Sequence, residues 1–107
     1  MRITVFTPAY NRGYIIEKLY RSLQNQTFRN FEWLIIDDGS SDNTSEKIQS
    51  FIQDNNDFPI IFEKVENGGK HRAINLGVQK ARGELFFIVD SDDYLTNTSL
   101  EICLLYT

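Results

Sequence analysis

Four short apolar runs alternate with segments of helical periodicity, and this alternation restricts the possible folds more than any other feature of the sequence. The runs are rich in β-branched and aromatic residues, so we predict buried strands over 3–7, 31–36, 59–65 and 85–89. Between them, apolar residues recur at helical spacing, which predicts helices over 14–26, from Asn43 onward, over 70–82 and from Thr98 onward. Strands separated by helices form parallel sheets, and continuously apolar strands fit burial on both faces. The sequence therefore predicts one α/β domain over 1–107, with a mostly parallel sheet and helices on both faces.

Individual residues predict where these elements begin and end. Pro8 is expected to end the first strand, and the run that starts at Asp37 is expected to end the second. Asn43, with Glu46 three residues later, is the expected N-cap of the second helix. Gly83 is the expected stop of the third helix, whose apolar side is expected to contain Ala73, Ile74, Gly77, Val78 and Ala81.

Composition and charge exclude several classes of protein. With 107 residues, of which 41% are hydrophobic and 24% charged, the chain can form one globular domain with a core. The net charge is −4 and the basic residues are scattered, so a nucleic-acid partner is not expected. A bound phosphate would therefore need a metal ion or a helix N-terminus as its source of positive charge.

The two ends of the chain and its one cysteine predict a cytoplasmic fragment. Cys103 has no second cysteine to pair with and is expected to be a small buried hydrophobic residue. The first apolar run is too short for a signal sequence, and no segment approaches the roughly 18 apolar residues of a membrane span. The sequence ends within an apolar helical pattern, so we expect a truncated domain. Its absent part could carry a membrane anchor. The same pattern predicts an exposed apolar end that would favour homo-oligomers, formed by Leu100, Ile102, Leu104 and Leu105.

Acidic residues follow two of the predicted strands. Asp37 and Asp38 follow the second, and Asp90, Asp92 and Asp93 follow the fourth. Ligands of open parallel sheets bind at the carboxyl ends of the strands, where these five carboxylates would repel one another. A divalent cation would remove that repulsion, and carboxylate oxygens suit Mg²⁺ or Mn²⁺ together with substrate phosphates.

Each of these motifs also has a purely structural interpretation. A helix cap or turn at 90–93 is about as probable as a metal site when that segment is considered alone, and Asp38-Gly39 alone favours a turn. Lys70, at a helix start after two glycines, could meet a phosphate, although a solvated helix face is the better interpretation of 70–72. His71 is the single histidine, so the sequence gives little support to a Ser-His triad or a histidine metal site.

Taken together, the motifs resemble the family 2 glycosyltransferases of the GT-A fold. The resemblance runs nearly from end to end and keeps the order and spacing of each block. The blocks that carry it are 7–12, 22–28, 31–44, 67–71, 75–77 and 81–93. It implies a Rossmann-like nucleotide-binding half, the N-terminal part of an enzyme that transfers a sugar, with inversion, from a nucleoside-diphosphate sugar. It also implies a UDP-sugar donor, a saccharide or lipid-linked acceptor, a Mn²⁺ or Mg²⁺ cofactor, and a role in bacterial polysaccharide biosynthesis.

The same resemblance implies roles for individual residues. Asp90 and Asp92 match the Asp-X-Asp motif of the family, so Asp92 would hold the metal and Asp90 would lie near the ribose or the metal waters. Asp93 is an alternative metal ligand. Asp38 would accept a hydrogen bond from uracil, and Tyr10 would lie beside the base. The other nucleotide-binding residues implied are Thr7, Pro8, Arg12, Lys70 and Ser91. The catalytic base would lie beyond Thr107, because Glu101 is the only acidic residue after Asp93.

Two other classes of function remain open at this point. Asp-X-Asp after an apolar strand also occurs in haloacid-dehalogenase-type phosphatases, but there it follows the first strand and not the fourth. A truncated, non-catalytic module that binds nucleotide or oligomerises is the second alternative.

Overall fold

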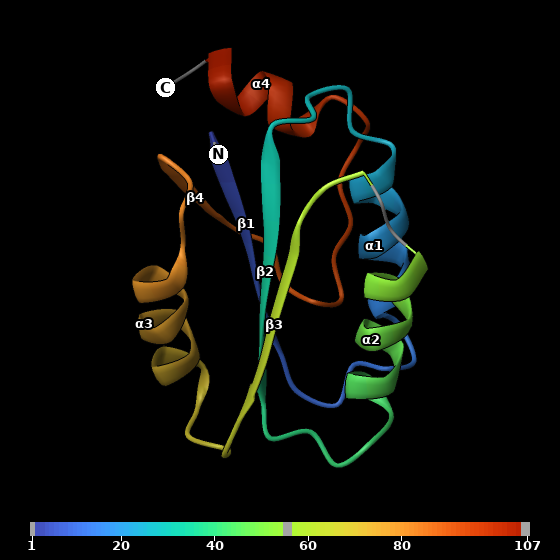
Figure 1. The fold of residues 1–107 in the computed structure, drawn as a ribbon, viewed down its shortest axis with the longest axis vertical. Coiled ribbons are helices and arrows are strands. Elements are labelled where there is room, and N and C mark those ends of the chain that lie inside the picture. Colours follow the sequence, from blue (N-terminus) through green and yellow to red (C-terminus); the bar gives the residue numbers. More distant parts are fainter. Residues whose placement is uncertain (1, 55–56, 106–107) are drawn as a thin grey trace.

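The computed structural model describes residues 2–54 and 57–105 and confirms the α/β class. Strands and helices alternate along the chain (Figure 1). The elements are β1 Ile3–Ala9, α1 Ile16–Gln24, β2 Phe31–Asp38, α2 Thr44–Asp54, β3 Ile60–Val65, α3 Lys70–Lys80, β4 Leu85–Ile88 and α4 Ser99–Leu105.

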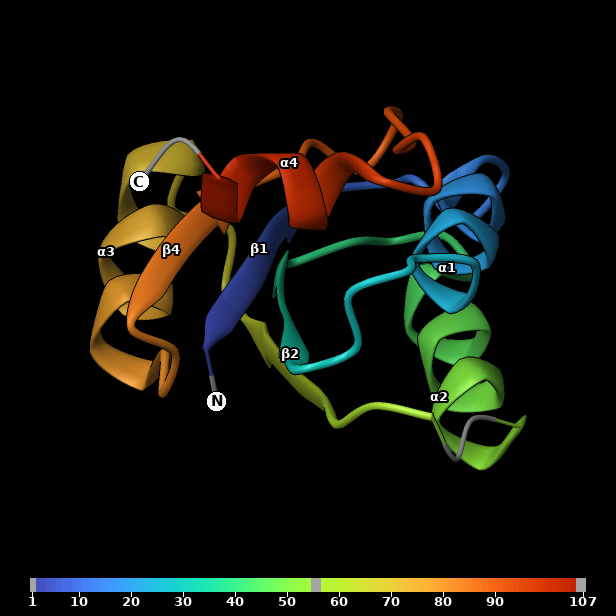
Figure 2. The same cartoon turned by 90° about the horizontal axis from the view of Figure 1, so that it is seen from above.

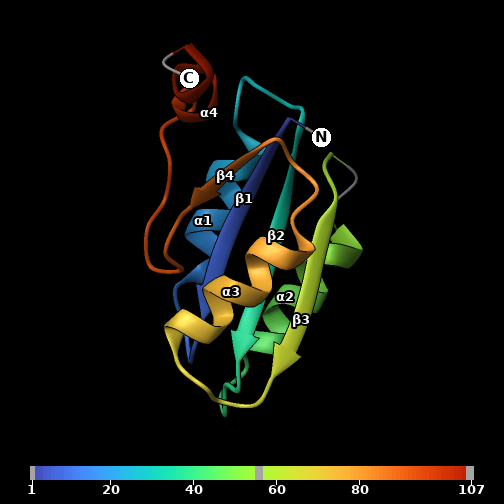
Figure 3. The same cartoon turned by 90° about the vertical axis from the view of Figure 1, so that its left-hand side faces the viewer.

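The four strands form one parallel sheet in the order β3-β2-β1-β4. Helices α1 and α2 cover one face of the sheet and α3 covers the other, as Figures 1 and 2 show. Helix α4 lies at the end of the sheet where β1 begins (Figure 3). The carboxyl ends of the strands, where ligands of such sheets bind, are therefore at the opposite end from α4.

Alternation of side chains along the two central strands divides the core in two. Ile3 and Val5 of β1 pack with Trp33 of β2 in the larger cluster, under α1 and α2. Phe6 packs with Leu34 in the smaller cluster, under α3. The Cβ atoms of neighbouring strand residues point to opposite faces, so sequence parity decides which face a side chain occupies.

The structure corrects the predicted ends of the first two strands. Strand β1 does not end at Pro8 but continues to Ala9, with Pro8 in register with Ile36. Strand β4 accompanies β1 only as far as Phe6, so Pro8 has a neighbouring strand on one side only, where a missing N–H is tolerated. Strand β2 likewise includes Asp37 and Asp38, because both residues pair with β3.

Two predictions about helix ends and faces were also wrong, and a third was right only in position. Helix α2 begins at Thr44, so Asn43 occupies the N-cap position, but the side chain that accepts from the backbone N–H of Thr44, at 3.0 Å, is that of Asp42. Gly83 is not a helix stop: a Cβ there would lie 2.4 Å from the backbone nitrogen of Thr4, so Gly83 is needed where the chain crosses β1. Val78 was expected on the apolar side of α3 but is 58% exposed, because the side of this helix that faces the sheet is the one that contains Ala73 and Gly77.

The apolar end of the chain is only partly exposed. Leu100 is fully buried and Leu104 packs against the larger cluster, whereas Ile102 and Leu105 are exposed. Cys103, expected to be buried, is half-buried. Within the described ranges 2–54 and 57–105, no helix combines the length and the apolar character needed to cross a bilayer.

A buried carboxylate stabilises the end of the sheet that lies opposite the ligand-binding edge. Glu32 of β2 is fully buried and accepts hydrogen bonds from the Thr4 hydroxyl at 2.6 Å and from Arg82 Nε at 2.7 Å. It also accepts from the backbone N–H of Arg82 at 2.8 Å. Burial raises the pKa of Glu32, but the hydrogen bonds from Thr4 and Arg82 and the Arg82 charge outweigh it, so the pKa is lowered from its usual 4.5.

Candidate functional site

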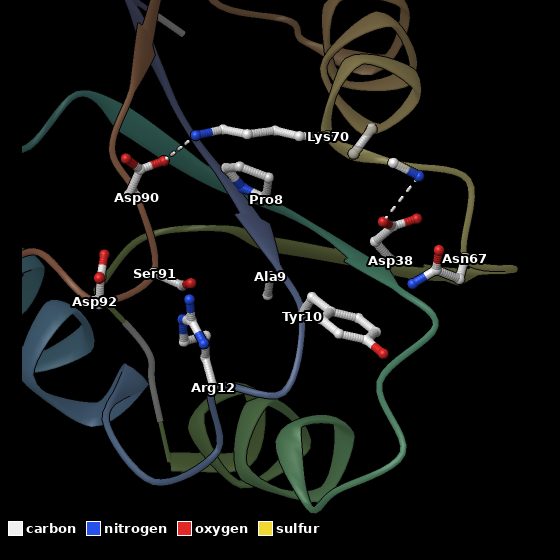
Figure 4. Close-up of a pocket in the computed structure, with 12 residues that line it drawn as sticks. Pro8, Ala9, Tyr10, Arg12, Asp38, Asn67, Lys70, Asp90, Ser91 and Asp92 are labelled. Carbon is white, nitrogen blue, oxygen red and sulfur yellow. Dashed lines mark hydrogen bonds and ion pairs between the residues drawn. The ribbon is translucent and has the colours of Figure 1, made fainter.

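A pocket of about 420 Å³ opens at the carboxyl ends of the strands, on the side of the sheet that α3 covers. Figure 4 shows the side chains that line it. They come from the ends of β1 and β2, the start of α3 and the segment after β4. The lining residues are Pro8, Ala9, Tyr10, Arg12, Asp38, Asn67, Gly69, Lys70, Ala73, Asp90, Ser91 and Asp92.

Sequence parity decides which strand residues reach this pocket. Pro8 and Asp38 lie on the α3 side and line it. Their neighbours Thr7 and Asp37 lie on the other face. The Thr7 hydroxyl accepts a hydrogen bond from Trp33 Nε1 at 2.9 Å, in the core. Thr7 was predicted to bind nucleotide, but it does not line the pocket.

Asp37 is buried and serves the turn that follows β2. Its Oδ1 accepts from the backbone N–H of Ser40 at 3.0 Å and from the hydroxyl of Ser40 at 2.5 Å, and its Oδ2 accepts from the Ser45 hydroxyl at 3.1 Å. The five carboxylates expected at this edge therefore do not form a single cluster. Asp37 points to the α2 side, Asp38 lies near α3, and the remaining three follow β4.

Asp38 fixes the turn that leads into α3. Its two carboxylate oxygens accept from the backbone N–H groups of Gly68 at 2.8 Å and Gly69 at 3.1 Å. The dashed line from Asp38 in Figure 4 marks its contact with this turn. Asp38, which lines the pocket, thus also fixes the position of the start of α3 and of Lys70.

Gly39 allows the close approach on which this arrangement depends. Its φ is +77°, and a Cβ would lie 2.7 Å from the backbone nitrogen of Asn67. We expect Gly39→Ala to lower the free energy of unfolding by about 2–4 kcal/mol, because it adds a backbone clash to conformational strain. Gly69→Ala is a comparison for strain alone, since a Cβ there would meet nothing within 4 Å, although its φ of +94° and ψ of 160° are nearly confined to glycine. Urea unfolding measures both variants, and a loss below about 1 kcal/mol in Gly39→Ala would contradict the close approach.

The loop after β1 is held by the loop after β2. Asn11 has a φ of +53°, which is uncommon outside glycine, and its Oδ1 accepts from the backbone N–H of Ser41 at 2.9 Å. The N–H of Arg12 donates to the Thr44 hydroxyl at 3.0 Å, and that of Gly13 donates to Asp42 at 3.2 Å. Hydrogen bonds from Thr44 lower the pKa of Asp42. These contacts fix the backbone on both sides of Arg12, whose guanidinium points toward Ser91 in Figure 4.

Three carboxylates after β4 form an oxygen-rich cluster. One oxygen from each of Asp90, Asp92 and Asp93 lies within 4.8 Å of the other two. Asp92 and Asp93 are exposed and Asp90 is half-buried. Lys70 Nζ lies 2.9 Å from Asp90 Oδ1. Hard oxygen donors at this spacing fit Mg²⁺ or Mn²⁺, and two of the three residues, Asp90 and Asp92, line the pocket.

Most of the predicted site residues therefore meet in one place. The structure brings together Pro8, Tyr10, Arg12, Asp38, Lys70, Asp90, Ser91 and Asp92, and leaves Thr7 and Asp93 outside the pocket lining. Glu101 accepts from the Thr27 hydroxyl at 2.9 Å, at the far end of the sheet. Sequence reasoning missed four lining residues, Ala9, Asn67, Gly69 and Ala73. The Asn-Gly-Gly turn after the third strand was the available signal for two of them.

Comparison with known proteins shows the family and the fold of the chain. The model of the family described as glycosyl transferase family 2 matches residues 4–106. The glycosyltransferase GlyG of Streptococcus pneumoniae is 34% identical over 99 residues, which are 92% of this chain and 33% of GlyG.

Two solved structures superpose on nearly the whole chain. The crystal structure of S. aureus TarS in complex with UDP-GlcNAc has a TM-score of 0.90 and 30% identity, over 99% of this chain and 31% of that one. The mannosyltransferase PcManGT from Pyrobaculum calidifontis, in complex with GDP-Man and Mn²⁺, has a TM-score of 0.82 and 28% identity, over 87% of this chain and 28% of that one. The chain thus spans about a third of the length of each of these three relatives.

Proposed function

The chain belongs to glycosyl transferase family 2, and from that premise we propose that residues 1–107 form the nucleotide-diphosphate-sugar-binding portion of a GT-A glycosyltransferase. The enzyme transfers a sugar, with inversion, from a UDP-sugar to a saccharide or lipid-linked acceptor, with the help of Mn²⁺ or Mg²⁺. The family membership argues against the phosphatase alternative, because that class is a different family with a different strand position for its aspartates.

One observation carries the proposal: a single pocket contains an aromatic side chain, a flexible cation and two aspartates of the acidic cluster. Tyr10 is 47% exposed and offers a ring face to a base. Lys70 stands at the N-terminus of α3, where backbone N–H groups and the helix dipole favour a phosphate. That TarS was solved with UDP-GlcNAc, and PcManGT with GDP-Man and Mn²⁺, supports a nucleotide sugar and a divalent cation as the ligands.

Different residues of the pocket would contact the base, the diphosphate and the metal. Tyr10 and Asp38 would face the base, with Asp38 held in place by Gly68 and Gly69. Lys70 would face the diphosphate, and Asp90 and Asp92 would hold the metal. A divalent ion bound there would stabilise the charge that the diphosphate leaving group gains as the sugar departs. Asp93 remains an alternative ligand because its carboxylate belongs to the same cluster.

The proposal is tested by titrating UDP into the 107-residue chain by calorimetry, once with Mn²⁺ and once with excess EDTA. We expect binding with Mn²⁺ and a large loss with EDTA, because the metal links the carboxylates to the diphosphate. No binding to a chain that circular dichroism shows to be folded would contradict the proposal. GDP is the control ligand: equal affinity for GDP would contradict the choice of uracil while supporting the metal–diphosphate site.

A further inference from the structure

An ion pair spans the pocket between two different elements of the fold. Lys70 Nζ, from the start of α3, lies 2.9 Å from Oδ1 of Asp90, which follows β4. In Figure 4 the Lys70 side chain extends over Pro8 to reach this carboxylate. The pair is therefore a contact across the proposed diphosphate position, and its cation is the only one that a salt bridge joins to the acidic cluster within the described residues.

The position of Lys70 opposes ligation of a metal by Asp90. A Mg²⁺ ligand oxygen lies about 2.0–2.1 Å from its ion. With the ammonium 2.9 Å from Asp90 Oδ1, a metal on the same oxygen would lie within roughly 5 Å of the ammonium, at a distance where like charges repel. Without a metal, the same ammonium offsets the repulsion among Asp90, Asp92 and Asp93.

A nucleoside diphosphate gives Lys70 a second partner. The lysine side chain is a compact charge on a flexible stem, and it begins at a helix N-terminus that also favours phosphate. We infer that Lys70 is a resident counter-ion of Asp90 that moves to the diphosphate when nucleotide binds, so that nucleotide and metal each strengthen the binding of the other. This inference rests on the proposed function of the pocket. It adds that Lys70 opposes the binding of metal alone and no longer opposes it when nucleotide is bound.

Removing the Lys70 charge should have opposite effects on the two ligands. We expect Lys70→Gln to tighten the binding of Mn²⁺ alone by up to roughly fivefold, the value of an exposed ion pair at low salt. The same variant should weaken the binding of UDP measured in EDTA. The factor by which UDP tightens Mn²⁺ should fall accordingly, and by linkage the factor by which Mn²⁺ tightens UDP falls equally.

The experiment measures free Mn²⁺ by electron paramagnetic resonance at low ionic strength, with and without UDP, and UDP binding in EDTA by calorimetry. Lys80→Gln is the matched control, because Lys80 lies at the other end of α3 and pairs with Glu63 at 3.2 Å. It removes the same charge from the same helix and should leave all three affinities unchanged. A loss of fold in Lys70→Gln would weaken every affinity, which is not the expected pattern.

The outcomes separate this inference from the proposed function. Tighter Mn²⁺ binding to Lys70→Gln, with weaker UDP binding and unchanged Lys80→Gln, supports the inference. Unchanged or weaker Mn²⁺ binding to Lys70→Gln, when wild-type chain binds Mn²⁺ and UDP together, overturns the inference and leaves the proposed function standing. Absence of Mn²⁺-dependent UDP binding to the wild-type chain overturns both.

Discussion

Replacing Asp92 with asparagine is expected to reduce UDP binding in the presence of Mn²⁺ to the level measured in EDTA. Asp92 is the exposed member of the acidic cluster that also lines the pocket, so its carboxylate is the one best placed to join a metal to a bound diphosphate. Loss of an outer-shell partner of a metal site weakens binding by about 10- to 100-fold, and loss of a direct ligand should weaken it at least as much. Calorimetry of the variant with UDP and Mn²⁺ measures the effect.

Asp93→Asn is the matched control for this prediction. Its carboxylate belongs to the same cluster but Asp93 does not line the pocket, so the same loss of charge should weaken binding far less. The thermal midpoints of both variants should not fall, because each removes one of three carboxylates that repel one another. A larger loss in Asp93→Asn than in Asp92→Asn would show that the metal is held by the other register of the Asp-Ser-Asp-Asp run.

Exchanging Arg82 for methionine is expected to lower the free energy of unfolding by about 2–3 kcal/mol at pH 7. Glu32 is fully buried and would lose its charged partner. Removing one partner of a buried pair destabilises by about 3–5 kcal/mol, and we expect less here because the Arg82 side chain is 57% exposed and partly solvated. Arg2→Met is the control: Arg2 pairs with Glu84 on the surface, and loss of such a pair changes stability little.

The pH dependence of this effect has a definite sign. The folded-state pKa of Glu32 is lowered, so its contribution is complete above the usual value of 4.5 and is lost as pH falls through the folded-state pKa. In Arg82→Met, the charge and the side-chain hydrogen bond of Arg82 no longer oppose the effect of burial, so the pKa of Glu32 is higher than in the wild-type protein. The difference in stability between the two proteins should therefore shrink as pH falls below about 5. Urea unfolding between pH 7 and pH 4 measures it, and a constant difference would contradict the role of the Glu32 charge.

The order and type of the elements could be predicted because each apolar run is long enough to mark a strand. Exact ends could not, because they depend on neighbouring strands. Pro8 remains in β1 since β4 has already separated from that side, and Asp38 remains in β2 since β3 continues beside it. Neither fact is present in the local sequence, where proline and Asp-Gly both indicate an end.

The chemistry of the site could be predicted more fully than its geometry. The residue types after β4 fit a turn as well as a cation site when they are considered alone, and the structure brings their carboxylates together. The face on which a strand residue lies depends on register, which is why Thr7 lies in the core beside Trp33 while Pro8 lines the pocket. The contact of Lys70 with Asp90 joins residues 20 positions apart on different elements, and no local pattern predicts it.

The two hydrogen bonds that Asp38 accepts limit how this pocket can change during evolution. Both of its oxygens already hold the turn before α3, so a substitution of Asp38 would release the start of the helix that carries Lys70. If Asp38 faces the base and Lys70 the diphosphate, as proposed, base preference and phosphate contact would change together. A descendant with a new preference at this position would first need another acceptor for the Gly68 and Gly69 N–H groups, and the surroundings of that turn are where compensating substitutions would accumulate.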